Sequence, residues 1–124
     1  DTVVQEAEGL LARAGAGWTL AYREGENSGL GDTKTILRLE PERVTLTRLG
    51  ELNSRMVFQV GVPHTSPYDT PYGAIPLTVR THRLETALEE EGGTIEIDYQ
   101  IELGGGAAGV NRLRLQVRKK ENIL

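Results

Sequence analysis

Apolar and polar residues alternate along most of this chain with the two-residue period of half-buried β-strands. The clearest alternation covers residues 95–103, in which Ile95, Ile97 and Tyr99 are separated by acidic and amide side chains. The same period continues over residues 112–118 and marks several earlier segments. We predict strands in those segments at residues 17–24, 34–40, 44–48, 56–60 and 74–84.

Residues 68–73 (YDTPYG) and the strand predicted after them organise the middle of the chain. Pro71 fixes φ and Gly73 relaxes the backbone again, so Thr70 to Gly73 indicate a tight type I or II turn. Pro63 and Pro67 lie just before this turn. Because proline has no amide hydrogen, we expect the segment before the turn not to pair as a central strand.

Clusters of glycine, proline and asparagine separate the other predicted strands. They predict a loop at residues 25–32, a proline turn at 40–43, an acidic turn at 89–93 and a loop at 104–109. Residues 2–14 are ambiguous between helix and strand. We predict two short strand pieces there, bent at Gly9.

Short strands at regular spacing, with turns between them and no convincing long helix, are typical of an antiparallel sandwich or barrel. Short consecutive connections favour an up-and-down meander, and closing the meander removes exposed edges. We therefore predict a single all-β domain over residues 1–124, built as an antiparallel barrel of about eight strands. Such a barrel is either filled by side chains or holds one small ligand.

Composition excludes several classes of function. The chain has no cysteine, so it has no disulfide and no thiolate metal site. No apolar run approaches the roughly 20 residues of a membrane helix, and no signal-peptide pattern is present. The formal net charge of −4 and the pI of about 5.2 argue against a nucleic-acid partner. We expect a cytoplasmic protein with no membrane and no nucleic-acid partner.

Two motifs with conspicuous chemistry have plainer explanations. Gly104, Gly106 and Gly109 match G-x-G-x-x-G, but a phosphate loop leads into a helix, and here a predicted strand follows. We interpret the motif as a hairpin loop. His64 and His82 lack the aligned partners of a triad or a zinc site, and we interpret them as surface residues. No catalytic residue, metal site or cofactor is predicted.

Basic residues follow one face of the last predicted strand, and acidic residues follow the matching face of the strand before it. If Ile101 pairs with Leu113, then Glu102 lies opposite Arg112. Opposite charges across strands stabilise a sheet by roughly 0.2–1 kcal/mol per pair. We therefore interpret the basic stripe as a neutralised, solvated face.

Several polar residues share the parity of apolar neighbours and so point into the predicted barrel. These residues are Glu24, Arg48, Thr81 and Tyr99. A buried arginine is rarely left unpaired, so we expect Arg48 to meet a carboxylate such as Glu24 near one end of the barrel. Two interpretations stay open. The groups orient the polar head of a ligand, or they form an internal hydrogen-bond network that fixes the strand register.

Several short pieces occur together in a recognisable order. They are residues 22–24 (YRE), 44–50 (VTLTRLG), 56–58 (MVF) and 68–73 (YDTPYG). In this combination the chain resembles the YwiB-like family of small bacterial proteins, a domain of unknown function, from about residue 8 to residue 117. The resemblance implies a calycin-like, lipocalin-like barrel in a bacterial cytoplasm, and it implies no established activity.

The family pattern and the inward parity together define the candidate site. The candidate ligand-binding residues are Tyr22, Glu24, Arg48, Tyr68, Thr70, Tyr72, Thr81 and Tyr99. Members of the family usually have one more strand before the stretch that matches residues 2–7. We therefore expect the barrel to be open at that edge, the chain to have been shortened, or a neighbouring molecule to fill the gap.

Three functions follow from these features. The first is a non-enzymatic barrel that binds a small apolar or amphipathic molecule. The alternative is a protein-interaction module or homodimer that uses residues 62–73 or an open sheet edge. The second alternative is a hydrolase built from Glu24, Arg48 and the tyrosine turn.

Overall fold

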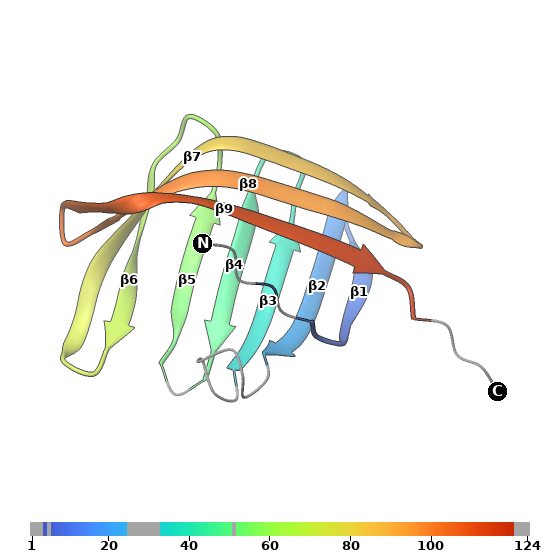
Figure 1. The fold of residues 1–124 in the computed structure, drawn as a ribbon, viewed down its shortest axis with the longest axis horizontal. Helices are drawn as coiled ribbons and strands as arrows, with labels where there is room; N and C mark the ends of the chain where they lie inside the picture. The colour runs from blue at the N-terminus through green and yellow to red at the C-terminus, as the bar shows by residue number, and fades with distance from the viewer. Residues whose placement is uncertain (1–3, 5, 25–32, 51, 121–124) are drawn as a thin grey trace.

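The computed structural model describes residues 4, 6–24, 33–50 and 52–120, and it describes Glu24, Ala107 and Ala108 by their backbone alone. Within these residues, nine strands form one antiparallel sheet in which each strand pairs with the next along the chain (Figure 1). The strands are β1 (Gly9–Ala14), β2 (Gly17–Glu24), β3 (Thr33–Leu39), β4 (Val44–Leu49), β5 (Ser54–Phe58), β6 (His64–Thr70), β7 (Gly73–Glu89), β8 (Gly92–Leu103) and β9 (Gly106–Arg118). This order confirms the predicted all-β, up-and-down architecture.

The sheet curls into an open half-barrel. Strands β2 to β5 form one wall, and the long strands β7 to β9 arch across them (Figure 1). β1 and β9 are the two ends of the strand order, and within the described residues they do not pair with each other. The expected open edge is therefore present. Near it, Lys120 Nζ lies 2.6 Å from Glu8 Oε1, so the segments flanking the two edge strands touch.

The strand register aligns apolar residues into two rows across the inner face of the first wall. The outer apolar row is Trp18, Leu39, Val44 and Phe58, and the middle apolar row is Leu20, Leu37, Leu46 and Met56. The arched strands close this core with Leu77, Val79, Ile95 and Ile97. Burying one such side chain contributes about 1.5–3 kcal/mol, so the alternation in the sequence supplies most of what holds the sheet together.

A β-bulge in β7 keeps its apolar side chains inside. Thr81 pairs with Tyr99 and Arg83 pairs with Asp98, so His82 is an extra residue in β7. Before the bulge the buried residues are odd-numbered, as in Val79 and Thr81. After it the inward residues are even-numbered, as in Leu84. The extra residue therefore shifts the alternation by one position, so that the apolar side chains in the second half of the strand still point inward.

The predicted tight turn is present at the end of β6. Thr70 pairs with Gly73, which has a φ of 116° that an L-residue rarely adopts. The Thr70 hydroxyl donates a hydrogen bond to the Gly73 carbonyl at 2.6 Å and accepts one from the Tyr72 amide at 3.1 Å. The side chain thus satisfies backbone groups that the turn leaves open.

The segment before the turn is a strand that lies between β5 and β7 in the sheet. The prediction that this segment does not pair as a central strand was therefore wrong. β6 pairs along its length with β7, where Pro67 faces Pro76. Neither proline can donate a hydrogen bond, so this pair falls between the hydrogen-bonded positions of the ladder. On its other side β6 pairs with β5 only through Ser54 and Tyr68, so the missing amide hydrogen of Pro67 costs little there.

The N-terminal prediction is correct only in its second half. Strand β1 begins at Gly9, whereas Val4 and residues 6–8 belong to no strand. Residues 1–3 and 5 lie outside the described residues. A Cβ added at Gly9 would lie 2.4 Å from the Ala21 carbonyl oxygen, so glycine is needed there for close approach to β2 rather than for a bend.

The last hairpin is tighter than predicted, and its register differs. Gly104 and Gly105 have φ values of 59° and 87° and form a two-residue turn, after which β9 starts directly. Ile97 therefore pairs with Leu113, and Ile101 pairs with Gly109 instead of Leu113. The glycine motif lies between two strands, as the hairpin interpretation requires.

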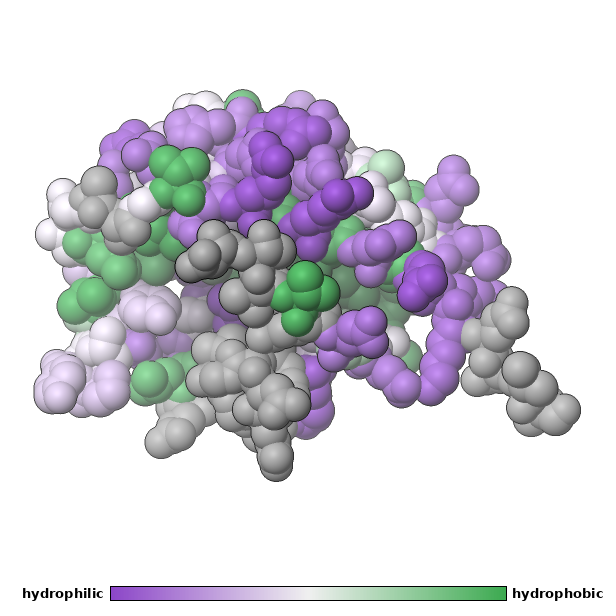
Figure 2. Space-filling model, in the orientation of Figure 1, coloured by the Kyte–Doolittle hydropathy of each residue, from purple (hydrophilic) through white to green (hydrophobic). Residues whose placement is uncertain are grey.

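The charge neutralisation predicted for this hairpin is present with other partners. Arg112 Nε lies 2.7 Å from Asp98 Oδ1, and Arg114 Nε lies 3.3 Å from Glu96 Oε1. Arg83 joins both carboxylates from β7. Figure 2 shows hydrophilic residues gathered along the upper arch, where β7 to β9 run in Figure 1. This convex face is a solvated charge network.

Candidate functional site

A third row on the inner face is polar, and it lies beside the two apolar rows. The register runs across four strand pairs and aligns Tyr22, Thr35, Arg48, Ser54 and Tyr68. Two residues along a strand cover about 6.7 Å, so this polar row begins one such step from the middle apolar row. It lies toward the end of the wall that carries the connection between β4 and β5. Three predicted site residues, Tyr22, Arg48 and Tyr68, are thus brought into one line.

Tyr99 extends from the opposite wall to Phe58 in the outer apolar row. Its ring packs edge-on against Phe58, with the ring centroids 4.9 Å apart. Burial raises the pKa of the Tyr99 hydroxyl, and the positive charge of Arg48 opposes that rise. Because this charge acts on the hydroxyl, β4 and β8 bring Arg48 and Tyr99 into one electrostatic environment.

Thr81 lies directly opposite Tyr99 on β7 and is only 5% exposed. Its Oγ1 is buried and has no hydrogen-bond partner within the part of the chain that the structure describes. A buried hydroxyl without a partner costs about 1–3 kcal/mol. Thr81 also adjoins the bulge at His82, and bulges often occur next to binding sites. Thr81 bridges Val60, two residues after Phe58, so it lies beyond the outer apolar row and not in the polar row.

The two remaining turn residues do not join it. The Thr70 hydroxyl is engaged within its own turn, which gives it a structural role. Tyr72 is 99% exposed at the tip of the hairpin. The predicted contact between Arg48 and Glu24 involves a side chain outside the described residues. The backbone of Glu24 pairs with Thr33, one row beyond Thr35.

His82 is exposed and His64 is half-buried, and each has a simple partner. His64 Nε2 lies 2.9 Å from Gln59 Oε1, and His82 Nε2 lies 3.3 Å from Gln100 Oε1. In the described ranges there is no group of three or more His, Asp and Glu residues that could hold a metal ion. The same part of the chain contains no helix of the length and apolar character needed to cross a membrane.

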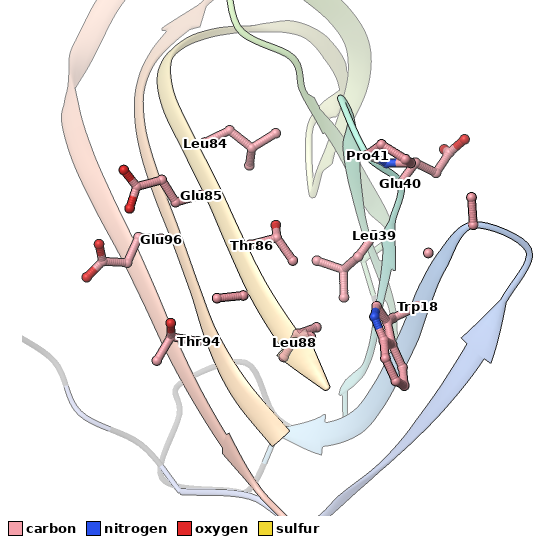
Figure 3. Close-up of a pocket in the computed structure, with 13 residues that line it drawn as sticks. Trp18, Leu39, Glu40, Pro41, Leu84, Glu85, Thr86, Leu88, Thr94 and Glu96 are labelled. Carbon is pink, nitrogen blue, oxygen red and sulfur yellow. The ribbon is translucent and has the colours of Figure 1, made fainter. Parts of the chain in front are cut away.

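A pocket of about 640 Å³ opens at the other end of the inner face, where β7 faces β2 and β3. Figure 3 shows Leu84 and Thr86 extending from β7 toward Leu39, with Trp18 and Leu88 below. Glu85 and Glu96 extend from the opposite side of the arched strands (Figure 3). Apolar side chains and the hydroxyl of Thr86 therefore face the space between the walls, and Glu40, Glu85 and Glu96 also line the pocket.

None of the candidate residues predicted from the sequence lines this pocket. Residues such as Leu84 and Leu88 were not singled out because the inward phase of the strand changes at His82. The sequence did indicate the change of phase. The inward residues up to Thr81 are odd-numbered, whereas the next large apolar residue, Leu84, is even-numbered. Thr35 and Ser54 were also missed, although each shares the parity of buried neighbours on its strand.

Comparison with known proteins identifies the family. The model of a domain of unknown function, DUF1934, matches residues 1–115. The uncharacterized β-barrel protein YwiB of Bacillus subtilis (strain 168) is 29% identical over 79 residues, which are 64% of this chain and 56% of the relative. The crystal structure of the ywiB protein from Bacillus subtilis aligns with a TM-score of 0.68 at 26% identity, over 76% of this chain and 65% of that one.

The chain therefore spans less than two thirds of the length of these two matches. The solved relative is a β-barrel protein by name and shares the arrangement of strands described above. The family match covers most of the chain, and residues 22–24, 44–50 and 68–73, which carry the resemblance, lie within the matched range. This chain is a member of the DUF1934 family.

Proposed function

We propose that this protein binds a small apolar or amphipathic molecule and does not transform it chemically. The observation that carries the proposal is the open pocket between β7 and the first wall. Its volume of about 640 Å³ lies within the range of pockets that hold small ligands, roughly 300–1,000 Å³. Its lining combines apolar side chains such as Trp18, Leu39 and Leu84 with two threonines and three glutamates, so it offers both apolar surface and polar groups to a ligand.

The pocket lining supports an uncharged apolar group as the part of the ligand that is buried. Trp18 and Leu39 belong to the buried core and also line the pocket, so a ligand there would extend the core. The pocket carboxylates are engaged by arginines. Arg83 holds Glu85 at 2.8 Å and Glu96 at 3.0 Å, and Arg43 holds Glu40 at 3.3 Å. Thr86 is the hydroxyl best placed to orient a polar atom of the ligand.

Trp18 gives a direct test, because it is the single tryptophan of the chain. We expect decanol to change the Trp18 fluorescence of the wild-type protein saturably. Thr86→Phe fills the pocket and should weaken binding at least tenfold. Gln116→Phe places the same ring on the exposed face of β9 and should leave binding unchanged. A fluorescence response that is absent, or equal in both variants, would contradict the proposal.

One observation favours a second candidate function, a homodimer. The strand order leaves β1 and β9 as sheet edges within the described residues, and an edge strand offers unpaired backbone groups to another chain. Light scattering coupled to size-exclusion chromatography tests this. A mass of twice 13.6 kDa at micromolar concentration supports the homodimer, and a strict monomer excludes it.

A further inference from the structure

We infer that the ligand of the pocket is an amphiphile with an anionic head group, and that Arg13 binds this head group while the apolar part lies in the pocket. The inference rests on the proposed function and names the class of ligand. Arg13 lies on β1, directly opposite Trp18 on β2. Its guanidinium carbon lies 4.7 Å from the centroid of the Trp18 ring. Trp18 also lines the pocket, so one side chain contacts both the apolar space and a positive charge.

The hydrogen-bond donors of Arg13 are available to a ligand. Within the described residues no carboxylate pairs with Arg13, whereas Arg43 and Arg83 each hold glutamates of the pocket lining. Stacking on an aromatic ring uses the face of a guanidinium, and its five N–H donors lie in the plane of the group. Arg13 can therefore remain over Trp18 while its planar fork holds two oxygens of a carboxylate or phosphate.

The position of Arg13 suits the charged end of an amphiphile. β1 leads into the turn that lines the pocket with Ala16 and Gly17. β1 is also an end of the strand order, and within the described residues it does not pair with β9. Arg13 is exposed there, so a head group bound to it keeps much of its hydration and avoids the cost of a buried ion pair. The apolar part of the same molecule is buried against Trp18 and Leu39.

The carboxylates of the pocket lining raise the opposite possibility, a cationic head group. Glu85 and Glu96 extend from the far side of the arched strands (Figure 3), and Arg83 holds both. Arg43 holds Glu40. These arginines compensate the negative charges of the lining, whereas within the described residues no carboxylate compensates the guanidinium on β1. The charge balance around the pocket therefore favours an anion.

Isothermal titration calorimetry of the full chain tests the inference with amphiphiles that share one alkyl chain and differ in the head group. The probes are decanol, decanoate, decyl phosphate and decyltrimethylammonium, each kept below its micellar concentration at constant ionic strength. We expect at least one anion to bind roughly tenfold tighter than decanol, the ratio expected for one charge-assisted hydrogen-bonded pair. The tighter of the two anions identifies the head group that the site prefers.

Variants assign this preference to Arg13. In Arg13→Gln the affinity ratio of the preferred anion to decanol should fall from roughly tenfold to about one. Arg55→Gln removes the same charge from an exposed position on β5 and should keep the wild-type ratio. Because each ratio compares two ligands of one variant, it is insensitive to any general weakening of the pocket when Arg13 no longer packs on Trp18.

Three results would overturn the inference and leave the proposed function standing. The first is decanol binding with neither anion binding more tightly. The second is tighter binding of decyltrimethylammonium than of both anions, because the glutamates of the lining would then select the head group. The third is an equal affinity ratio in Arg13→Gln and Arg55→Gln. If the wild-type chain binds none of the four probes, the proposed function itself fails and the inference fails with it.

Discussion

At the scale of single residues, the inner polar groups differ in how well the protein satisfies them. Thr35 is fully buried and has an interaction partner, whereas Thr81 is buried with an unpaired hydroxyl among the described residues. Both lie on the inner face of the half-barrel. The pair therefore allows a comparison in which the residue type and the burial are the same and the hydrogen bonding differs.

Thr81→Val should leave the free energy of unfolding unchanged or raise it by up to about 1 kcal/mol, because the valine methyl removes an unsatisfied hydroxyl without leaving a cavity. The matched Thr35→Val should lower it by about 1 kcal/mol, since a satisfied group is lost. Urea unfolding measures both. Equal destabilisation by the two variants would show that the Thr81 hydroxyl is bonded in solution.

Arg48 should control the ionisation of Tyr99. Burial raises the pKa of Tyr99 and Arg48 lowers it, so Arg48→Gln should raise that pKa further. Carbon-13 spectra of the tyrosine ring carbons, recorded against pH, measure it, with Arg55→Gln as the control. An unchanged Tyr99 pKa in Arg48→Gln would contradict the effect of the Arg48 charge on the Tyr99 hydroxyl.

The direction of the Tyr99 pKa shift also determines how the free energy of unfolding depends on pH. The pKa of Tyr99 is higher in the folded than in the unfolded chain. Above the ordinary tyrosine pKa of about 10 the unfolded chain therefore loses its proton first. The contribution of Tyr99 to stability is intact below that pH and decreases as the pH rises through the folded-state pKa. The decrease should be steeper in Arg48→Gln.

At the scale of elements, the bulge in β7 sets which side chains of each half of the strand point inward. Thr81 precedes it beside Val60, and Leu84 follows it toward the pocket. The alternation of residues 74–81 and of 95–103 predicted both partner strands correctly. The bulge was not predicted, because the alternation of apolar and polar residues changes phase at His82. In the sequence this change looks like the end of a strand near Leu84.

Deletion of His82 should be tolerated. Without it, Thr81, Arg83 and Leu84 alternate inward and outward in a regular strand with the same partners on β8. We expect a change in the free energy of unfolding below about 1.5 kcal/mol. Deletion of Thr78 moves Val79 outward and Arg80 inward, and burial of an unpaired charge should cost more than about 3 kcal/mol. Thermal unfolding of both deletions measures this, and equal destabilisation would contradict the assigned bulge.

At the scale of the whole molecule, the strand period and the turn residues were sufficient to predict the meander. They were not sufficient for β6, because Pro63 and Pro67 argue locally against pairing, and only the sparse pairing of β5 to β6 makes Pro67 acceptable. The register of the last hairpin depended on whether the glycines of residues 104–109 form a loop or a two-residue turn, which sequence alone does not decide.

The candidate site was predictable only in part, for a related reason. Inward parity correctly identified Arg48, Thr81 and Tyr99 as groups that face the interior. The assembly of a row from Tyr22 to Tyr68 depends on the register of four strand pairs, and the pocket depends on how far β7 arches over β2 and β3. Both are properties of the closed sheet rather than of any single strand.

The central claim is that the half-barrel holds a small molecule, and native mass spectrometry of the chain recovered from bacterial cells tests it most directly. We predict the mass of the chain plus that of a small molecule, which gentle collisional activation removes. Thr86→Phe should lose that molecule, whereas the matched Gln116→Phe should keep it. The bare mass of the wild-type chain under the gentlest conditions, together with no response to decanol, would contradict the account.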